Sequence, residues 1–274
     1  MTFRPALRPG ALLLRRDAGH LQVGTSPGIV VADRPGLVPL LRLLDGVRGV
    51  GRLQEMVDAA VPELDAPVSA VLTELCALGV VVDASSIERA TLRRAGHRVR
   101  IEATPGAGDL VRAMSALLTS SGVIHLTSTD PDLLVVVSYA EASRGRYEQA
   151  SVLGLDHLPV VVDEDRVRVG PLVQPGRTPC LTCHDLHRAD WDPAWPVLLH
   201  QMDGPLVRGP LGPLNALTTQ AAALEATSEV LAHADGRATR TAGRCLVVGP
   251  GHDERTTWPV AFHHRCSCDL LHAA

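Results

Sequence analysis

The most informative part of the sequence is VGPLVQPGRTPCLTC, residues 169–183. It contains an apolar run, a turn rich in proline and glycine, and two cysteines, Cys180 and Cys183, with two residues between them. This CxxC spacing lets two thiolates bind one metal ion at about 2.3 Å from each sulfur. A second pair, Cys266 and Cys268, follows about 80 residues later. We predict that the four cysteines bind one tetrahedral zinc ion in a structural site.

The second pair separates zinc binding from the other common use of a CxxC motif. A redox dithiol needs a single pair at the start of a helix that follows a strand, with one thiol of lowered pKa. Because two pairs occur, we favour zinc over a dithiol or unrelated buried thiols. Zinc would attach the C-terminal tail to the body of the fold, since the pairs are too distant for a compact finger. The other two cysteines, Cys76 and Cys245, are predicted core residues.

Histidines flank both cysteine pairs, so one of them could replace a cysteine as a ligand. They are His184 and His187 beside the first pair, and His263 and His264 beside the second. Four thiolates complete a tetrahedral shell without them. We therefore interpret these histidines as surface residues near a loop.

Composition excludes several classes of enzyme. Hydrophobic residues make up 46% and charged residues 20% of the 274-residue chain, which suits a globular protein of two domains. The net charge of -4 argues against a protein that binds mainly by neutralising phosphates. All 26 basic residues are arginine. Without lysine there is no Schiff-base lysine, no phosphate-loop lysine, and no lysine of the kind that many adenylating enzymes place on ATP.

The sequence indicates a cytoplasmic protein without a membrane partner. The apolar run at residues 11–14 ends at Arg15 and Arg16 and is too short for a signal peptide core, and no stretch reaches the length of a membrane span. In a reducing compartment, close cysteine pairs are more often metal ligands or redox groups than disulfides.

Residues 1–90 are predicted to form a small first domain. Residues 10–32 have the pattern of three short strands, and the apolar spacing that follows is typical of three short helices. The helical positions are Leu37, Leu40, Leu41, Leu44, Leu53, Met56, Val57, Val68, Val71, Leu72, Leu75 and Leu78. Residues 83–96 are polar and lack a clear apolar stripe, so we place the domain junction there.

Residues 91–274 are predicted to form an α/β domain, because strands and helices alternate along it in the way that indicates a parallel sheet. Helices are expected after residue 108 and at 215–234. Strands are expected at residues 99–103, 123–126, 133–137 and 158–162, in a hairpin at 166–174, and in a last pair at 244–248 and 257–263.

A glycine turn, TPGAGDLV at residues 104–111, follows an expected strand and opens an expected helix, which is the context of a phosphate-binding turn. Gly106 and Gly108 match two glycines of such a motif. Val111 stands in place of the third, and Pro105 removes a backbone donor. Asp130 lies near the expected position of a ribose-binding acid. We interpret Gly106, Gly108 and Asp130 as a vestigial nucleotide turn, and ATP is not an expected cofactor.

Residues 169–183 resemble the zinc-knuckle approach of the ThiF-type, ubiquitin-activating-like superfamily, where a strand and a Pro-Gly-x-x-Pro-Cys-x-x-Cys turn recur. With the expected strands at 133–137 and 158–162 and the second cysteine pair, the resemblance covers residues 97–274. It implies a Rossmann-like sheet domain with a structural zinc site. It implies no catalytic residue, because the Ser-Asn-Leu-Asn-Arg-Gln type of segment, the ATP lysine and a catalytic cysteine in a crossover loop are absent from the sequence.

Residues 10–82 resemble the PqqD-like peptide-recognition domain, a small winged-helix fold. The segments GIVVA (28–32), LLRLLDGVR (40–48) and VLTELCALGV (71–80) follow its pattern. In this mode of recognition an extended peptide adds to an unpaired edge strand beside a helix. Val71, Leu72 and Leu75 are expected in the core. The predicted peptide-binding residues are Ile29, Val30, Val31, Ala70, Thr73, Glu74 and Ala77.

In this order the two halves resemble the leader-peptide-binding proteins of azoline-forming natural-product pathways, in which an inactive ThiF-like unit accompanies a YcaO-type cyclodehydratase. The 274 residues include no YcaO-type segment, so the resemblance implies that a YcaO-type or other modifying enzyme acts on the precursor leader peptide in trans. ThiF-like relatives commonly dimerise through the sheet domain, so a homodimer is a further expectation.

Two other functions stay open. The first is an ATP-dependent adenylating enzyme of the ThiF type, acting on a peptide or sulfur-carrier carboxylate. The second is a winged-helix DNA-binding regulator, although acidic residues scattered through the same region disfavour nucleic acid. The arginines that suggest it are Arg4, Arg8, Arg15, Arg16, Arg42, Arg48 and Arg52. We favour a non-catalytic binding protein over both.

Overall fold

The computed structural model describes residues 3–126, 129–202, 214–251 and 254–268. The chain divides into two compact units, Met1–Thr91 and Leu92–Ala274. The division falls within α4 (Ala84–Gly96), a helix of 13 residues in which only Ser85 is buried. A helix this exposed needs no apolar stripe, and so the sequence there shows none.

The first unit consists of two small antiparallel sheets and three helices. One sheet has the order β2 (Leu13–Arg15), β3 (His20–Val23), β4 (Ile29–Ala32). The helices are α1 (Leu37–Leu43), α2 (Val50–Ala60) and α3 (Val68–Ala77), so three strands and three helices occur where the sequence pattern predicts them. The other sheet pairs β1 (Pro5–Leu7) with β5 (Val81–Asp83).

The core of the first unit lies between the inner face of the three-stranded sheet and the helices. Leu21 and Val31 from the sheet and Leu40 and Leu53 from the helices are at most 3% exposed. Helix α3 contributes Val71, Leu72 and Leu75, which are buried as expected. Successive strand residues face opposite sides, so the neighbours of Val31 in β4 are left on the outer surface.

A six-stranded mixed sheet forms the centre of the second unit, in the order β11-β10-β9-β8-β7-β6. Three strands are parallel: β6 (Val99–Ala103), β7 (Leu133–Tyr139) and β8 (His157–Asp163). The other three run antiparallel to their neighbours: β9 (Arg166–Val169), β10 (Arg244–Val248) and β11 (Arg255–Pro259).

The expected parallel arrangement holds for β6, β7 and β8. The antiparallel part consists of β9, from the segment expected as a hairpin, and of β10 and β11, which lie in the expected last pair. Only Glu164 and Asp165 separate β8 from β9, and so short a connection can join only antiparallel neighbours. The strand expected at residues 123–126 is wrong. There, His125 makes an isolated bridge to Arg98, because the segment turns away after one pair.

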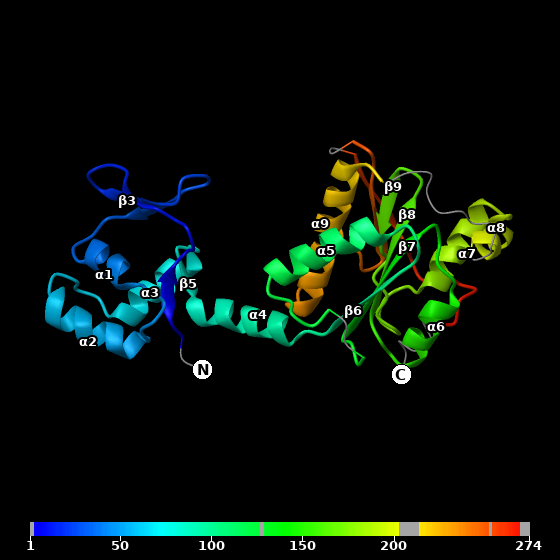
Figure 1. The fold of residues 1–274 in the computed structure, drawn as a ribbon. Helices are drawn as coiled ribbons and strands as arrows, with labels where there is room; N and C mark the ends of the chain where they lie inside the picture. The colour runs from blue at the N-terminus through cyan, green and yellow to red at the C-terminus, as the bar shows by residue number, and fades with distance from the viewer. Residues whose placement is uncertain (1–2, 127–128, 203–213, 252–253, 269–274) are drawn as a thin grey trace. The chain divides into compact units, whose positions relative to one another are not determined.

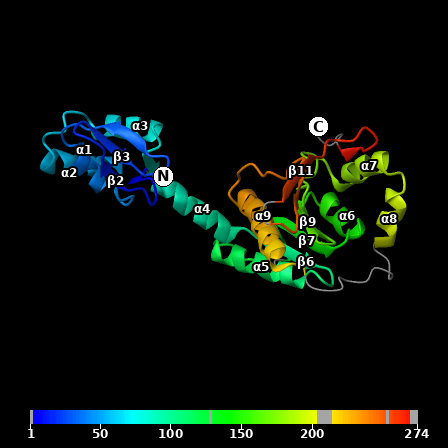
Figure 2. The same cartoon turned by 90° about the horizontal axis from the view of Figure 1, so that it is seen from above.

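Helices cover both faces of the sheet (Figure 1). On one face, α5 (Gly108–Ser120) and α9 (Ala216–Ala234) pack over a core that includes Met114 and Ala222. On the other face, α6 (Gly145–Val152) and α7 (Leu181–Trp191) contribute Tyr147 and Leu181 to a core that includes Val136 of the sheet. Figure 2 shows the same layers from above, with α8 (Trp195–Met202) following α7. None of the helices described here is both long and apolar enough to cross a bilayer.

Candidate metal centre and peptide-binding edge

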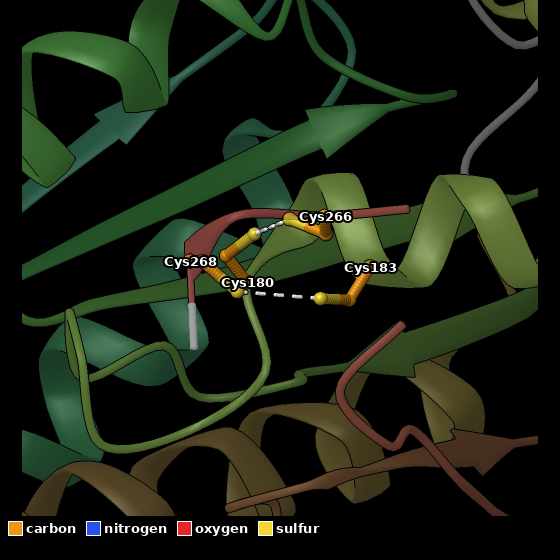
Figure 3. A group of neighbouring side chains, drawn as sticks. All are labelled: Cys180, Cys183, Cys266 and Cys268. Atoms are coloured by element: carbon orange, nitrogen blue, oxygen red, sulfur yellow. Dashed lines mark hydrogen bonds between the residues drawn. The ribbon is translucent and has the colours of Figure 1, made fainter. Parts of the chain in front are cut away.

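The structure brings the four predicted cysteines together (Figure 3). The Sγ atoms of Cys180 and Cys266 are 3.6 Å apart, and those of Cys183 and Cys268 are 3.3 Å apart. All four sulfurs lie within 4.8 Å of one another. A tetrahedral zinc ion with Zn–S bonds of about 2.3 Å places its sulfurs about 3.8 Å apart. The cluster therefore has the size and the donor set to hold a metal ion such as zinc.

The turn before α7 sets the position of the first pair. The Oγ1 atom of Thr178 accepts a hydrogen bond of 2.8 Å from the N–H of Gln174 and donates one of 2.9 Å to the Leu172 carbonyl. Gly176 has φ 73°, a conformation that favours glycine. Cys180 then caps α7, with Cys183 in the first helical turn. The proline and glycine of this motif thus form the turn that presents both sulfurs.

The thiols of the cluster cannot all ionise without a counter-charge. Burial and the neighbouring Cys180 thiol raise the pKa of Cys266 to about 11, and burial also raises the pKa of Cys268. The pKa of Cys180 is lowered, because backbone hydrogen bonds from Cys183 and Thr182 and hydrogen bonds from neighbouring thiols outweigh the opposing effect of burial. A divalent cation would supply the missing positive charge, since coordinated thiols bind as thiolates.

The flanking histidines do not join the cluster. Among the described residues, the group that could hold a metal contains only the four cysteines. The surface interpretation holds for His187 and His264, which are exposed, and is wrong for His184 and His263, which are each 2% exposed. The ring of His184 lies 3.3 Å from a carboxylate oxygen of Asp185, and that of His263 lies 2.8 Å from one of Asp190, so each buried ring has an acidic partner.

The other two cysteines lie elsewhere. Cys245 is buried in β10, and Cys76 packs partly buried against the core of the first unit. Burial raises the pKa of both thiols, which therefore behave as small apolar groups.

The glycine turn lies beside an acidic cavity. Gly106 has φ 92° and Gly108 begins α5, just after β6. The adjoining cavity has a volume of about 140 Å³ and is lined partly by Asp109, Glu164 and Asp165. Asp109 pairs with Arg112 and Asp165 with Arg166, so the carboxylates of this cavity would repel a polyphosphate only weakly.

The structure does not bring Asp130 to the glycine turn. Asp130 lies 2.5 Å from the guanidinium of Arg98, just before β6, whereas Gly106 follows that strand. The two positions are thus at opposite ends of β6. A sequence distance alone gave no information about which end of the sheet the acid would occupy.

Strand β4 is an edge strand that lies next to α3. Among the strands that the structure describes, it pairs with β3 alone. Ile29 lies near the turn that follows α3, where a Cβ at Gly79 would be 3.9 Å from the Ile29 Cδ1. Arg34, in the loop just after β4, forms an ion pair of 2.7 Å with Glu74 on α3. On α3 the predicted residues Ala70, Thr73, Glu74 and Ala77 are all exposed.

The backbone of β4 alternates between its two sides. The N–H of Asp33 donates to the Gly19 carbonyl at 2.8 Å, which shows that Asp33 faces β3. By alternation, Ile29 and Val31 also face β3, and Val30 and Ala32 direct their N–H and C=O groups outward. Of the three predicted strand residues, Val31 has its side chain in the core, and Val30 is 42% exposed.

A buried ionic network was not predicted from the sequence. Arg168 and Glu141, 4% and 6% exposed, form an ion pair of 2.5 Å, and Arg144 connects Glu141 to Asp185 on α7. Burial opposes ionisation of Glu141, but Arg168 and Arg144 keep its pKa below the ordinary value. The partners are distant in sequence, so no local pattern indicates the network.

No protein-family model matches the sequence, and no curated protein matches it significantly. Solved structures share its fold at low sequence identity. The heterocyclase TruD matches with TM-score 0.72 and 17% identity over 97% of this chain and 42% of its own. A heterocyclase in complex with substrate and cofactor matches with TM-score 0.71 and 16% identity over 98% of this chain and 40% of its own. This chain therefore spans less than half of each heterocyclase.

A second kind of structure matches over its whole length. The Microcin C7 biosynthetic enzyme MccB, in complex with N-formylated MccA, has TM-score 0.59 and 10% identity over 97% of this chain and 99% of its own. An MccB structure from E. coli with succinimide gives TM-score 0.61 and 10% identity over the same shares. Both units of this chain are thus found together in known folds.

Proposed function

We propose that this protein is a non-catalytic partner in the modification of a precursor peptide. Its first unit, a PqqD-like winged-helix domain, binds the leader peptide. Its second unit, a ThiF-like Rossmann-type domain with a structural zinc ion, docks a YcaO-type or other modifying enzyme that acts in trans. The observation that carries this proposal is the uncharged free edge of β4 beside α3.

The edge strands of the protein differ in how they are protected. Proteins commonly guard a free edge with charged residues or proline, which prevent unwanted pairing. Strand β6 carries Arg100 and Glu102, and β11 carries Arg255 and Pro259. Strand β4 has the sequence Ile-Val-Val-Ala, with neither charge nor proline. An edge left in this state suits pairing with a specific peptide.

The geometry of β4 defines how a peptide would bind. The outward N–H and C=O groups of Val30 and Ala32 would hydrogen-bond to the added strand. Peptide residues opposite Ile29 and Val31 would then point toward α3, because directly opposed residues face the same side of a sheet. The short side chains of Ala70 and Ala77 leave room there for apolar peptide residues at alternate positions.

The similar structures support a role in peptide modification at the level of fold. One matched heterocyclase is described with its substrate and cofactor, and MccB with N-formylated MccA. The matched heterocyclases are more than twice as long as the part that this chain covers. We propose that a separate enzyme supplies the activity that the remaining part of a heterocyclase chain would contain.

An adenylating enzyme is the second candidate. One MccB structure contains AMPCPP and matches 97% of this chain and 99% of its own, which favours this function. Two features of the chain oppose it: the sequence has no lysine, and Asp109, Glu164 and Asp165 line the cavity where phosphates would lie. We therefore place ATP chemistry second.

The DNA-binding alternative loses most of its support in the structure. Four of the seven arginines that suggest it form ion pairs with carboxylates of the same unit, so their charge is already balanced. The pairs are Arg4 with Glu88, Arg15 with Asp33, Arg48 with Asp45, and Arg52 with Glu55.

Fluorescence anisotropy with labelled candidate leader peptides tests the proposal. Val30→Pro removes an outward N–H donor and places a ring at the edge, whereas the matched control Val30→Thr keeps both the shape and the donor. We expect saturable binding to wild type, a loss of about ten-fold or more with Val30→Pro, and little change with Val30→Thr. Circular dichroism establishes that each variant is folded. Equal binding by all three proteins, or no saturable binding to any peptide, would contradict the proposal.

A further inference from the structure

The C-terminal tail contacts α7 through groups other than the cysteines. After β11, the N–H of Val260 donates to the Gly243 carbonyl at 2.8 Å. The next residue, Ala261, accepts a hydrogen bond of 3.0 Å from the Nε2–H of His187 on α7. The tail thus follows α7 before it reaches Cys266.

His263 is fixed on both sides of its ring. The N–H of Arg265 donates to Nδ1 at 3.1 Å, so Nδ1 carries no proton. Nε2 must then carry the proton in the neutral ring, and it donates to a carboxylate oxygen of Asp190 at 2.8 Å. Asp190, in the last turn of α7, also forms an ion pair with Arg265. These contacts define both the tautomer and the orientation of the ring.

The backbone of His263 joins the two cysteine pairs. Its N–H donates to the Sγ of Cys183 at 3.4 Å, and its carbonyl accepts a hydrogen bond of 2.8 Å from the N–H of Cys266. A single buried residue therefore contacts one cysteine of each pair. It does so without offering a ring nitrogen to the sulfurs, because both nitrogens are engaged elsewhere.

We infer that Asp190 and His263 are positioning residues for the metal centre, which hold the tail on α7 so that Cys266 and Cys268 meet Cys180 and Cys183. The inference rests on the proposed zinc site. Neither residue is a ligand. Each acts on the tail that carries two ligands, and outer-shell groups of this kind typically contribute about 10-fold to 100-fold to metal affinity.

Zinc affinity and release rate, measured by competition with a chromogenic chelator, test this inference. We expect His263→Ala and Asp190→Ala to weaken zinc binding by about 10-fold to 100-fold and to speed its release. The matched control is His20→Ala, because His20 is an exposed histidine of the first unit, whereas all four sulfurs belong to the second. It should leave affinity within about two-fold of wild type, well below the outer-shell effect.

A conservative variant and a second measurement test the same two residues. Asp190→Asn preserves the shape of the side chain, so it should fold even where His263→Ala does not, and it should weaken zinc binding less than Asp190→Ala. Trypsin cleavage after Arg265 in the zinc-loaded protein reports on tail release, and it should accelerate in Asp190→Ala but not in His20→Ala.

The outcomes distinguish this inference from the zinc site itself. Wild-type protein with less than about half an equivalent of zinc would overturn both, because four clustered thiolates should bind the ion outright. A different result would overturn the inference alone. In that case wild-type protein binds a full equivalent of zinc, and the folded His263→Ala and Asp190 variants show the same zinc affinity and the same rate of tryptic cleavage as wild type.

Discussion

The Sγ atoms of Cys183 and Cys268 lie 3.3 Å apart, although 85 positions separate them in the chain. Cys183 is fixed in the first turn of α7, whereas Cys268 belongs to the tail that follows β11. A contact between residues so far apart in sequence closes a long loop, which lowers the entropy of the chain. Binding of one ion by both residues would offset this loss of entropy. The stability of the second unit should therefore depend on the metal.

Loss of one ligand should release the metal and destabilise the second unit. Cys183→Ser removes a buried thiolate, so we expect less than about half an equivalent of bound zinc and a lower melting temperature. Cys76→Ser is the matched control, because Cys76 lies in the first unit, and it should keep one equivalent. Elemental analysis and calorimetry measure both properties. A fully zinc-loaded Cys183→Ser protein would show that the ligand set is wrong.

Removal of the metal by a chelator should destabilise the second unit and not the first. A strong chelator should lower the melting temperature of the second unit and leave the transition of the first unit unchanged, because the four sulfurs belong to the second. Differential scanning calorimetry of separate transitions provides the check. A chelator that shifts neither transition would indicate that the cysteines have no structural metal.

ATP chemistry should be absent. We expect no ATP–pyrophosphate exchange above background and no ATP binding by calorimetry, because the sequence has no lysine to contact ATP and the cavity beside Gly106 is lined partly by acidic residues. A side chain at Gly106 would be strained, since its φ is 92°. Exchange in wild type that disappears in Gly106→Val would support the adenylating enzyme instead.

The buried ion pair of Glu141 and Arg168 should make the free energy of unfolding depend on pH in the acid range. The folded pKa of Glu141 lies below its ordinary value of 4.5, so its stabilising contribution is present above about pH 4.5 and is lost as the pH falls through the folded pKa. Glu141→Gln leaves Arg168 buried without its partner charge, which should cost about 3–5 kcal/mol at neutral pH. It should also flatten the acid dependence.

Urea unfolding between pH 3 and 7 measures this dependence. Glu148→Gln is the control, because Glu148 is an exposed residue of α6, and it should behave like wild type. An equally steep loss of stability in wild type and in Glu141→Gln below about pH 4.5 would show that other carboxylates dominate.

Bulk on the exposed face of α3 should block peptide binding. Ala77→Trp fills the space beside β4, so we expect weaker binding without loss of the fold, since Ala77 is exposed. Ala59→Trp makes the same change on the exposed side of α2 and should have no effect. Anisotropy titrations compare the two, and an equal loss in both variants would point away from the β4–α3 edge.

The sequence predicts the elements of the fold better than their directions. Apolar spacing in Leu40, Leu53 and Leu72 identifies three helices, because burial of one face leaves a local pattern. The direction of β9 depends on a two-residue connection that composition does not reveal. The strand expected near His125 fails because only one residue of it finds a partner.

The candidate site was predictable only where its residues carry a local motif. The cysteine pairs are visible because two closely spaced pairs in one chain are a local pattern that indicates a shared metal. The contact of His263 with Asp190 spans 73 positions and has no local signature, and the surface interpretation of His263 therefore failed. Asp130 was assigned to the glycine turn from distance in sequence, and pairing with Arg98 keeps it at the other end of β6.

Amide hydrogen exchange in the presence and absence of a binding leader peptide tests the central claim most directly. The account predicts new protection of the Val30 and Ala32 amides, which face outward from β4, and no new protection along β6 or β11. Unchanged exchange at Val30 and Ala32 with the peptide bound, or protection gained at β6 or β11 instead, would contradict it.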